Sequence, residues 1–127
     1  DIKVFALFHD SKKLKYLPHS LGFQKGLIGV VHAFSAVHMS ESNNVIIAHE
    51  IMHTVGASDK YDPKSGQPIY PDGYAEPKLN PRYPQSKAEV MGGRIPINSK
   101  EASIPWSLKQ VTVGPQTAIE IGWLPGQ

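Results

Sequence analysis

Two stretches near the start of the chain are rich in apolar, β-prone residues. They cover residues 2–8 (Ile-Lys-Val-Phe-Ala-Leu-Phe) and 27–34 (Leu-Ile-Gly-Val-Val-His-Ala-Phe). Runs of this length, bounded by turn-forming residues, are typical of strands. The segment between them is interrupted by Pro18, Gly22 and Gly26 and is predicted as a loop. The pattern therefore predicts two strands of one sheet.

From Ser42 the spacing of apolar residues becomes that of a helix. Residues 42–44 (Ser-Asn-Asn) are favourable N-cap residues. Positions i, i+3, i+4, i+7 and i+8 then form one face, which consists of Val45, Ala48, His49, Met52 and His53. Gly56 is expected to end this helix, because glycine adopts the left-handed conformation common after a helix without a Cβ penalty.

The second half of the chain has weaker patterns. Residues 62–85 contain six prolines and two glycines, too many for regular structure, but Tyr70, Tyr74 and Tyr83 indicate a packed loop. Residues 107–113 are predicted as a short helix, and residues 116–123 as a second one entered through Gly114-Pro115. The predicted fold is α+β (or α/β): a small twisted sheet, one prominent helix, and an irregular C-terminal half with one or two helices.

Composition narrows the classes of partner and site. The 127 residues, of which 40% are hydrophobic, suit a single domain. With no cysteine, any metal site must use imidazole and carboxylate ligands. The net charge is only +2, and the cluster Lys12, Lys13 and Lys15 is interpreted as the solvated tip of a hairpin, so we expect no nucleic-acid partner. No apolar run approaches the roughly 20 residues that cross a bilayer, so no membrane contact is expected within this chain.

The start of the chain bears on its organisation. Asp1 is followed directly by the first strand-like run, without an initiator methionine. We expect residues 1–127 to be one domain and a fragment of a longer protein. The missing part could contain an upstream domain or a membrane anchor. The protein would then be extracytoplasmic or membrane-anchored.

The predicted helix contains the motif H-E-x-x-H, as His49-Glu50-Ile51-Met52-His53. Four residues advance a helix by about 6 Å and slightly more than one turn, so the two imidazoles share a face and can bind one Zn²⁺. Glu50 lies one position round the helix. From there its carboxylate can accept a proton from a water molecule as that water attacks a carbonyl group.

A catalytic zinc normally has three protein ligands, so a third is needed. Asp59 follows three residues after Gly56, which gives the spacing H-E-x-x-H-x-x-G-x-x-D. A turn-capping role for Asp59 is the structural alternative. The rival carboxylates are Asp62, Glu76 and Glu89.

This extended motif resembles that of the metzincin zinc metallopeptidases, H-E-x-x-H-x-x-G-x-x-H, in which a minority have a final Asp. The nearest likeness is to snapalysin, a small metallopeptidase group with that Asp. The likeness extends to Tyr61, two positions past Asp59, and to residues 88–93 (Ala-Glu-Val-Met-Gly-Gly), which are similar to the Met-turn. The chain departs from snapalysin in having no cysteine near this turn and a long proline-rich insert before it.

The resemblance implies an activity and a set of roles. His49, His53 and Asp59 would bind zinc, and Glu50 would be the general base. Met91 would lie beneath the metal site, and Tyr61 would be a candidate to stabilise the oxyanion. The chain would then be a zinc-dependent endopeptidase acting on a peptide or protein substrate.

Several alternatives remain open. The chain could be a catalytically inactive metal-binding module that serves partner binding. It could also be a non-haem iron oxygenase, because two histidines and a carboxylate form that facial triad as well. Met91 and Tyr61 could be ordinary core residues. Residues 30–34 could either be a sheet edge that binds extended peptides or an interior strand.

Overall fold

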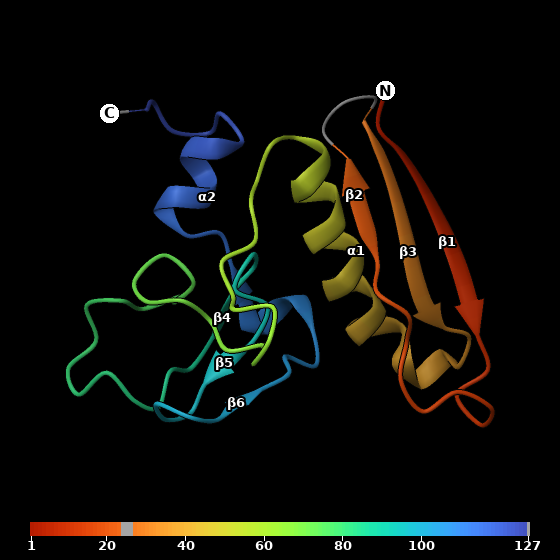
Figure 1. Ribbon diagram of the computed structural model, residues 1–127, viewed down its shortest axis with the longest axis horizontal. Helices are drawn as coiled ribbons and strands as arrows, with labels where there is room; N and C mark the ends of the chain where they lie inside the picture. The colour runs from red at the N-terminus through yellow and green to blue at the C-terminus, as the bar shows by residue number, and fades with distance from the viewer. Residues whose placement is uncertain (24–26, 127) are drawn as a thin grey trace.

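The N-terminal half is a small mixed sheet covered on one face by a helix (Figure 1). The computed structural model describes residues 1–23 and 27–126. Strands β1 (Lys3–His9), β3 (Ile28–Phe34) and β2 (Leu21–Phe23) lie side by side in the order β1-β3-β2. β1 and β3 are parallel, and β2 is antiparallel to β3. The two predicted strands are confirmed. β3 is the central strand: all of it pairs with β1, but only residues 28–30 pair with β2, so residues 31–34 have a strand partner on one side only among the described residues.

Strand β2 lies in the segment for which the breakers predict a loop, so that prediction is wrong there. The cause is Gly22, which the pattern alone presents as a breaker. A Cβ on Gly22 would lie 2.6 Å from the Cβ of His53 and 2.7 Å from the carbonyl oxygen of Glu50. Gly22 therefore permits close packing of a strand on a helix. Gly26, part of the same prediction, lies outside the described residues.

The predicted helix is α1 (Ser40–Thr54), preceded by the 3₁₀ turn η1 (Val37–Met39). It begins two residues before Ser42. Asn43, predicted to cap the helix, instead accepts a hydrogen bond from the Phe34 amide at 3.0 Å and donates one to the Phe34 carbonyl at 2.7 Å. This pair of bonds ties the first turns of α1 to the end of β3. The predicted stop is confirmed, because the helix ends at Thr54 and Gly56 has a φ of 111°.

The C-terminal half is irregular, as predicted. Its strands are short: β4 (Ala88–Glu89) pairs with β7 (Val111–Thr112), and β5 (Ile95–Pro96) with β6 (Ala102–Ser103). The predicted helix at 107–113 is wrong, since only the 3₁₀ turn η2 (Leu108–Gln110) forms before β7. The second one is confirmed as α2 (Pro115–Glu120), a shorter helix with Gly114 as its N-cap. The whole is an α+β fold.

The proline-rich loop is packed, as its tyrosines indicated. Tyr74 is buried, and its hydroxyl lies 2.8 Å from that of Tyr83. The rings of Tyr70 and Tyr74 meet edge to face with centroids 5.3 Å apart. These contacts give the loop a small aromatic core of its own.

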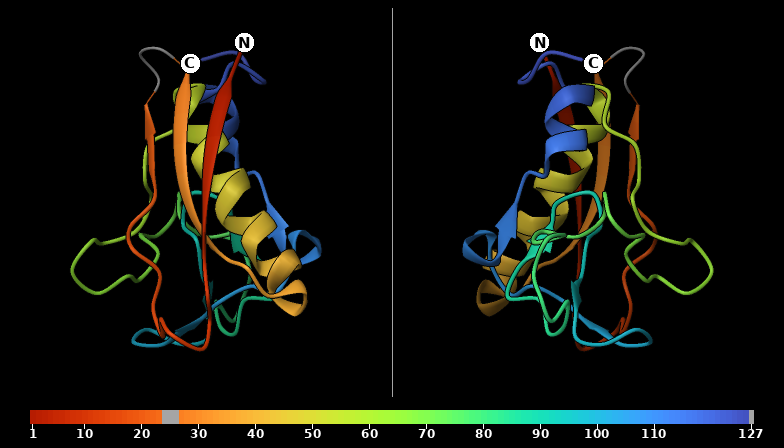
Figure 2. Two further views of the ribbon diagram at one scale, coloured as in Figure 1. Left: turned by 90° about the vertical axis from the view of Figure 1, so that its right-hand side faces the viewer. Right: turned by 90° about the vertical axis from the view of Figure 1, so that its left-hand side faces the viewer.

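The sheet face opposite α1 is apolar and uncovered by described residues (Figure 2, left). Phe5, Leu7, Leu21 and Phe23 are between 50% and 55% exposed. Lys12, Lys13 and Lys15 are exposed beyond the end of β1. They do not form a hairpin tip, because among the described strands β1 pairs with β3 alone, in parallel. No helix in the described ranges is long and apolar enough to span a bilayer.

Candidate metal centre

Three side chains meet at one point between α1 and the loop that follows it. The Nε2 atoms of His49 and His53 lie 3.1 Å apart. Asp59 Oδ1 lies 3.0 Å from the first and 2.9 Å from the second. The helical spacing therefore places the imidazoles as predicted, and the turn at Gly56 returns Asp59 to them.

The orientation of each imidazole is fixed by a backbone carbonyl. His49 Nδ1 lies 2.8 Å from the Val90 oxygen, and His53 Nδ1 lies 2.8 Å from the Ala57 oxygen. Because a carbonyl can only accept, each Nδ1 must carry the proton, and a neutral ring then has its lone pair on Nε2. Two lone pairs and a carboxylate oxygen thus converge. This arrangement is favourable only if a cation or an added proton lies among them.

The charges at this point act strongly on each other. Burial alone would raise the pKa of the Asp59 carboxyl, but its contacts with His49 and His53 outweigh burial and lower the pKa well below its usual range. Burial would lower the pKa of His53, yet the hydrogen bonds to Asp59 and Ala57 raise it. The site therefore favours an ionised Asp59 and a positive charge beside it.

Glu50 adds a second carboxylate beside the histidines. It is only 5% exposed, and its Oε2 atom has no hydrogen-bond partner in the described part of the chain. Burial is the main cause that raises the pKa of this carboxyl. One ligand-type atom each from His49, Glu50 and His53 lies within 4.8 Å of the others. This His-Glu-His group could hold a metal ion, and an ion nearby would compensate a buried carboxylate oxygen that has no hydrogen-bond partner among the described residues.

Helix α2 positions the loop that carries Asp59. Both neighbours of Asp59 bind Glu120: the amide and hydroxyl of Ser58 each donate to it at 2.9 Å, and the Lys60 ammonium at 2.7 Å. Lys60 is 5% exposed. Its amide also donates to the Met91 carbonyl at 2.9 Å. Contacts of the residue before Asp59 and of the residue after it therefore fix the position of Asp59.

The segment around Met91 packs against α1 and the loop that follows it. Met91 is fully buried with Ala57 and Val90, and Met52 of α1 packs against this cluster. The neighbouring Glu89 is also fully buried. It accepts hydrogen bonds from four groups, which are the amides of Met91, Gly92 and Gly114 and the Thr117 hydroxyl. Glu89 is thus a structural carboxylate that joins this turn to α2. Of the four candidate carboxylates, only Asp59 contacts the histidines.

Tyr61 lies beside the same group. Its ring centroid is 6.2 Å from that of His49. Burial, followed by the charges of Asp59 and Glu50, raises the pKa of its hydroxyl. The hydroxyl therefore stays protonated at neutral pH and is able to donate a hydrogen bond.

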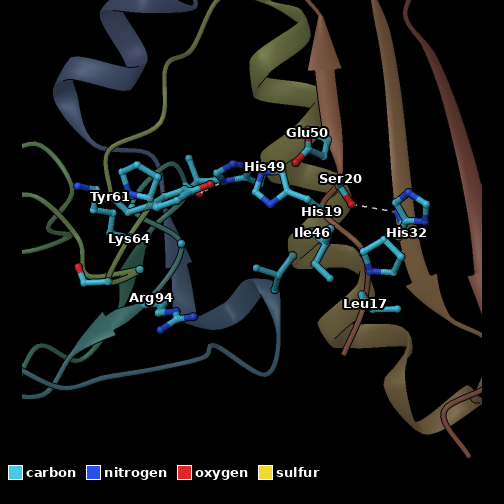
Figure 3. A pocket seen from close by; sticks show the side chains of 18 residues that line it. Leu17, His19, Ser20, His32, Ile46, His49, Glu50, Tyr61, Lys64 and Arg94 are labelled. Carbon is cyan, nitrogen blue, oxygen red and sulfur yellow. Dashed lines mark hydrogen bonds between the residues drawn. The ribbon is translucent and has the colours of Figure 1, made fainter. Parts of the chain in front are cut away.

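A cleft of about 600 Å³ opens beside His49, Glu50 and Tyr61 (Figure 3). Residues 17–20, which precede β2, form one wall, and residues 63–66 and 92–94 form the other. Sequence patterns gave no indication of Arg94 or Lys64 in this cleft, because neither belongs to a motif. Gly66 and Gly93 lie near them in the sequence and indicate turns, but they do not indicate a cleft.

Comparison with known proteins adds no relative. No protein family, curated protein or solved structure matches the chain. The site must therefore be interpreted from its own geometry.

Proposed function

We propose that the protein is a zinc-dependent endopeptidase of the metzincin type. In this proposal His49, His53 and Asp59 are the metal ligands. The observation that supports it most directly is the convergence of two imidazole Nε2 atoms and one carboxylate oxygen. Beside them lies the buried carboxylate of Glu50, whose Oε2 atom has no hydrogen-bond partner among the described residues. A neutral pair of imidazoles and one carboxylate is a donor set that zinc prefers.

When bound, zinc would polarise a scissile carbonyl and lower the pKa of a water molecule. Glu50 then takes the proton of the attacking water and passes it to the leaving amine nitrogen. Its raised pKa suits both transfers, because a general base that later acts as an acid works best with a pKa nearer neutrality. Tyr61 donates its hydroxyl proton in a hydrogen bond to the carbonyl oxygen as negative charge develops there.

Two other roles follow from the packing. Met91 forms an apolar floor with Ala57 and Val90, which keeps the carbonyls that orient the imidazoles in place. Outer contacts of this kind commonly control the affinity of a metal site. The proline-rich loop contributes the wall that holds Lys64 and Gly66, and so it takes part in forming the cleft.

The test replaces Glu50 by Gln, which keeps the shape of the side chain and removes its charge. We expect elemental analysis to show one zinc per chain in both proteins, and cleavage of a peptide library to fall by about 100-fold or more in the variant. Glu41→Gln is the control, because Glu41 is exposed in the first turn of the same helix.

Two results would contradict the proposal. Equal cleavage by wild type and Glu50→Gln would exclude Glu50 as the base. Stoichiometric zinc without cleavage of any peptide by wild type would instead favour the inactive metal-binding module.

A further inference from the structure

The cleft beside the candidate metal centre contains an excess of positive side chains. Arg94 and Lys64 line one wall, and Glu50 is the only carboxylate among the described lining residues. In Figure 3 these two cations lie on the same side of the cleft as Tyr61, opposite His19 and His32. Neither cation forms an ion pair with a described carboxylate. The excess charge is therefore not neutralised within the described part of the chain.

The guanidinium group of Arg94 lies close against the backbone of Gly66. A Cβ built on Gly66 would lie 3.0 Å from Cζ, 3.0 Å from Nη1 and 3.1 Å from Nη2 of Arg94. Nearly equal distances to these three atoms place the Gly66 backbone over the flat face of the guanidinium group. The hydrogen-bond donors of arginine point outward in the plane of that group, so they stay available.

The donors of this guanidinium have no acceptor among the described residues, although Arg94 is half-buried. Gly66 itself has a φ of 71°, a backbone conformation that residues with a side chain rarely adopt. The close approach of Arg94 to this backbone therefore depends on a glycine. Arg94 and Tyr61 both line the cleft, and they lie on the same side of it (Figure 3). Arg94 is thus close enough to act on a group bound beside Tyr61.

The rest of the cleft suits the neighbouring part of a peptide. Leu17, Pro18, Val45 and Ile46 supply apolar surface. A side chain with a short apolar stem and a terminal carboxylate would match this combination of apolar surface and a nearby guanidinium group. Arginine binds a carboxylate through two parallel hydrogen bonds, which lysine cannot do.

From this geometry we infer that Arg94, assisted by Lys64, selects peptides that carry a carboxylate close to the scissile bond. The inference rests on the proposed peptidase function and names its substrate class. The carboxylate can belong to a glutamate or aspartate side chain or to the C-terminus of a short peptide. The peptides used in the test separate these two sources.

The test compares peptides that differ only in Glu, Gln or Lys at the positions flanking the cleaved bond, each with a free and an amidated C-terminus. For wild type we expect kcat/KM to be about tenfold higher with Glu than with Gln. Arg94→Gln should bring this ratio close to one, Arg94→Glu should favour Lys, and Arg94→Lys should keep part of the preference for Glu. A preference that disappears on amidation would assign the carboxylate to the C-terminus.

Arg82→Gln is the matched control, because Arg82 is the other arginine of the chain and stacks on Tyr70 at 3.6 Å, outside the cleft. The ratio should remain that of wild type. A ratio near one in wild type, or an unchanged ratio in Arg94→Gln, would overturn the inference.

A binding measurement separates this inference from the proposed function. Fluorescence anisotropy of the labelled Glu and Gln peptides on Glu50→Gln protein needs no cleavage. Tighter binding of the Glu peptide, lost in the double variant with Arg94→Gln, supports the inference even if wild type cleaves nothing. Equal binding of both peptides contradicts it, even if wild type proves to be a peptidase.

Discussion

At the scale of single residues, the site depends on which carboxylate reaches the two imidazoles. Of the four carboxylates considered as the third ligand, Asp59, Asp62, Glu76 and Glu89, only Asp59 contacts both histidines. Glu89 is fully occupied by backbone amides and Thr117. The selection follows from the turn at Gly56 and from Glu120, which binds both neighbours of Asp59.

Replacing Asp59 by Asn should weaken zinc binding sharply. The amide keeps an oxygen atom but removes the negative charge of a direct ligand, and this should cost at least the 10–100-fold in affinity that outer partners of metal ligands typically contribute. Competition with a chromophoric chelator measures the dissociation constant. Asp62→Asn is the control, since Asp62 is exposed and accepts a bond from the Lys64 amide. Equal affinity of both variants would exclude Asp59 as a ligand.

At the scale of elements, buried polar side chains connect the pieces of this fold. Two buried polar residues of α1, Asn43 and Thr54, face the sheet: Asn43 bonds to the backbone of Phe34, and Thr54 packs against Gly29, which lets β3 approach the helix closely. A Cβ on Gly29, for example, would lie 3.7 Å from the Thr54 methyl group. In the C-terminal half Glu89 has the same connecting role between the Met91 turn and α2.

Glu89→Gln should destabilise the protein by about 2–4 kcal/mol, because the new amide group would face backbone N–H donors and leave buried groups unsatisfied. Urea unfolding measures the change. Glu41→Gln, an exposed glutamate of α1 without a hydrogen-bonded side chain among the described contacts, should change stability by less than about 0.5 kcal/mol. A similar small effect of both substitutions would show that the four bonds to Glu89 contribute little.

The ion pair between Glu120 and Lys60 predicts a pH dependence. Burial alone would raise the pKa of Glu120, but Lys60 and Ser58 outweigh it and lower the pKa below 4.5. A carboxyl with a lowered folded pKa stabilises the protein above its unfolded pKa, and this contribution disappears as the pH falls through the folded value. Wild type should therefore be more stable than Glu120→Gln at neutral pH, and the difference should shrink below about pH 4.5.

Urea titrations of both proteins at several pH values, with a chelator present to exclude metal effects, would measure that difference. All other carboxyls are the same in both proteins, so their titration cancels in the difference. One of them is Glu76, whose pKa is lowered chiefly by hydrogen bonds from Ser86. A difference that does not change with pH would contradict the assigned role of the ion pair.

At the scale of the whole molecule, the candidate metal centre lies where the two halves of the chain meet. The histidines come from α1, which packs on the sheet, whereas the carbonyl of Val90 and the anchor of Asp59 belong to the irregular half. Any cation held there would connect both halves. The described core is small and the sheet leaves one apolar face uncovered by described residues, so this connection should matter for stability.

Adding zinc should therefore raise the melting temperature, and chelation should lower it. A ligand that binds only the folded state stabilises it by about 4 kcal/mol at a thousand times its dissociation constant. Scanning calorimetry with zinc or with chelator measures the shift. His49→Ala is the control and should lose most of it. The same shift in this variant would place zinc elsewhere on the molecule.

The sequence by itself determined what depends on neighbours along the chain. The pitch of a helix brings residues four positions apart to one face, so spacing alone groups His49 and His53 with the adjacent Glu50 and identifies Gly56 as the end of α1. The apolar runs that form β1 and β3 likewise depend only on residues that are neighbours along the chain.

Only the tertiary structure decided which distant groups meet. The carbonyl of Val90, 41 residues from His49, sets the orientation of that imidazole, and Glu120 fixes a loop 62 residues earlier. The segment around Gly22 forms strand β2, in which the glycine allows close packing against α1. Arg94 lines the cleft and packs against Gly66, which lies far from it in the sequence. Local spacing carries no information about such contacts, since they depend on how whole segments pack.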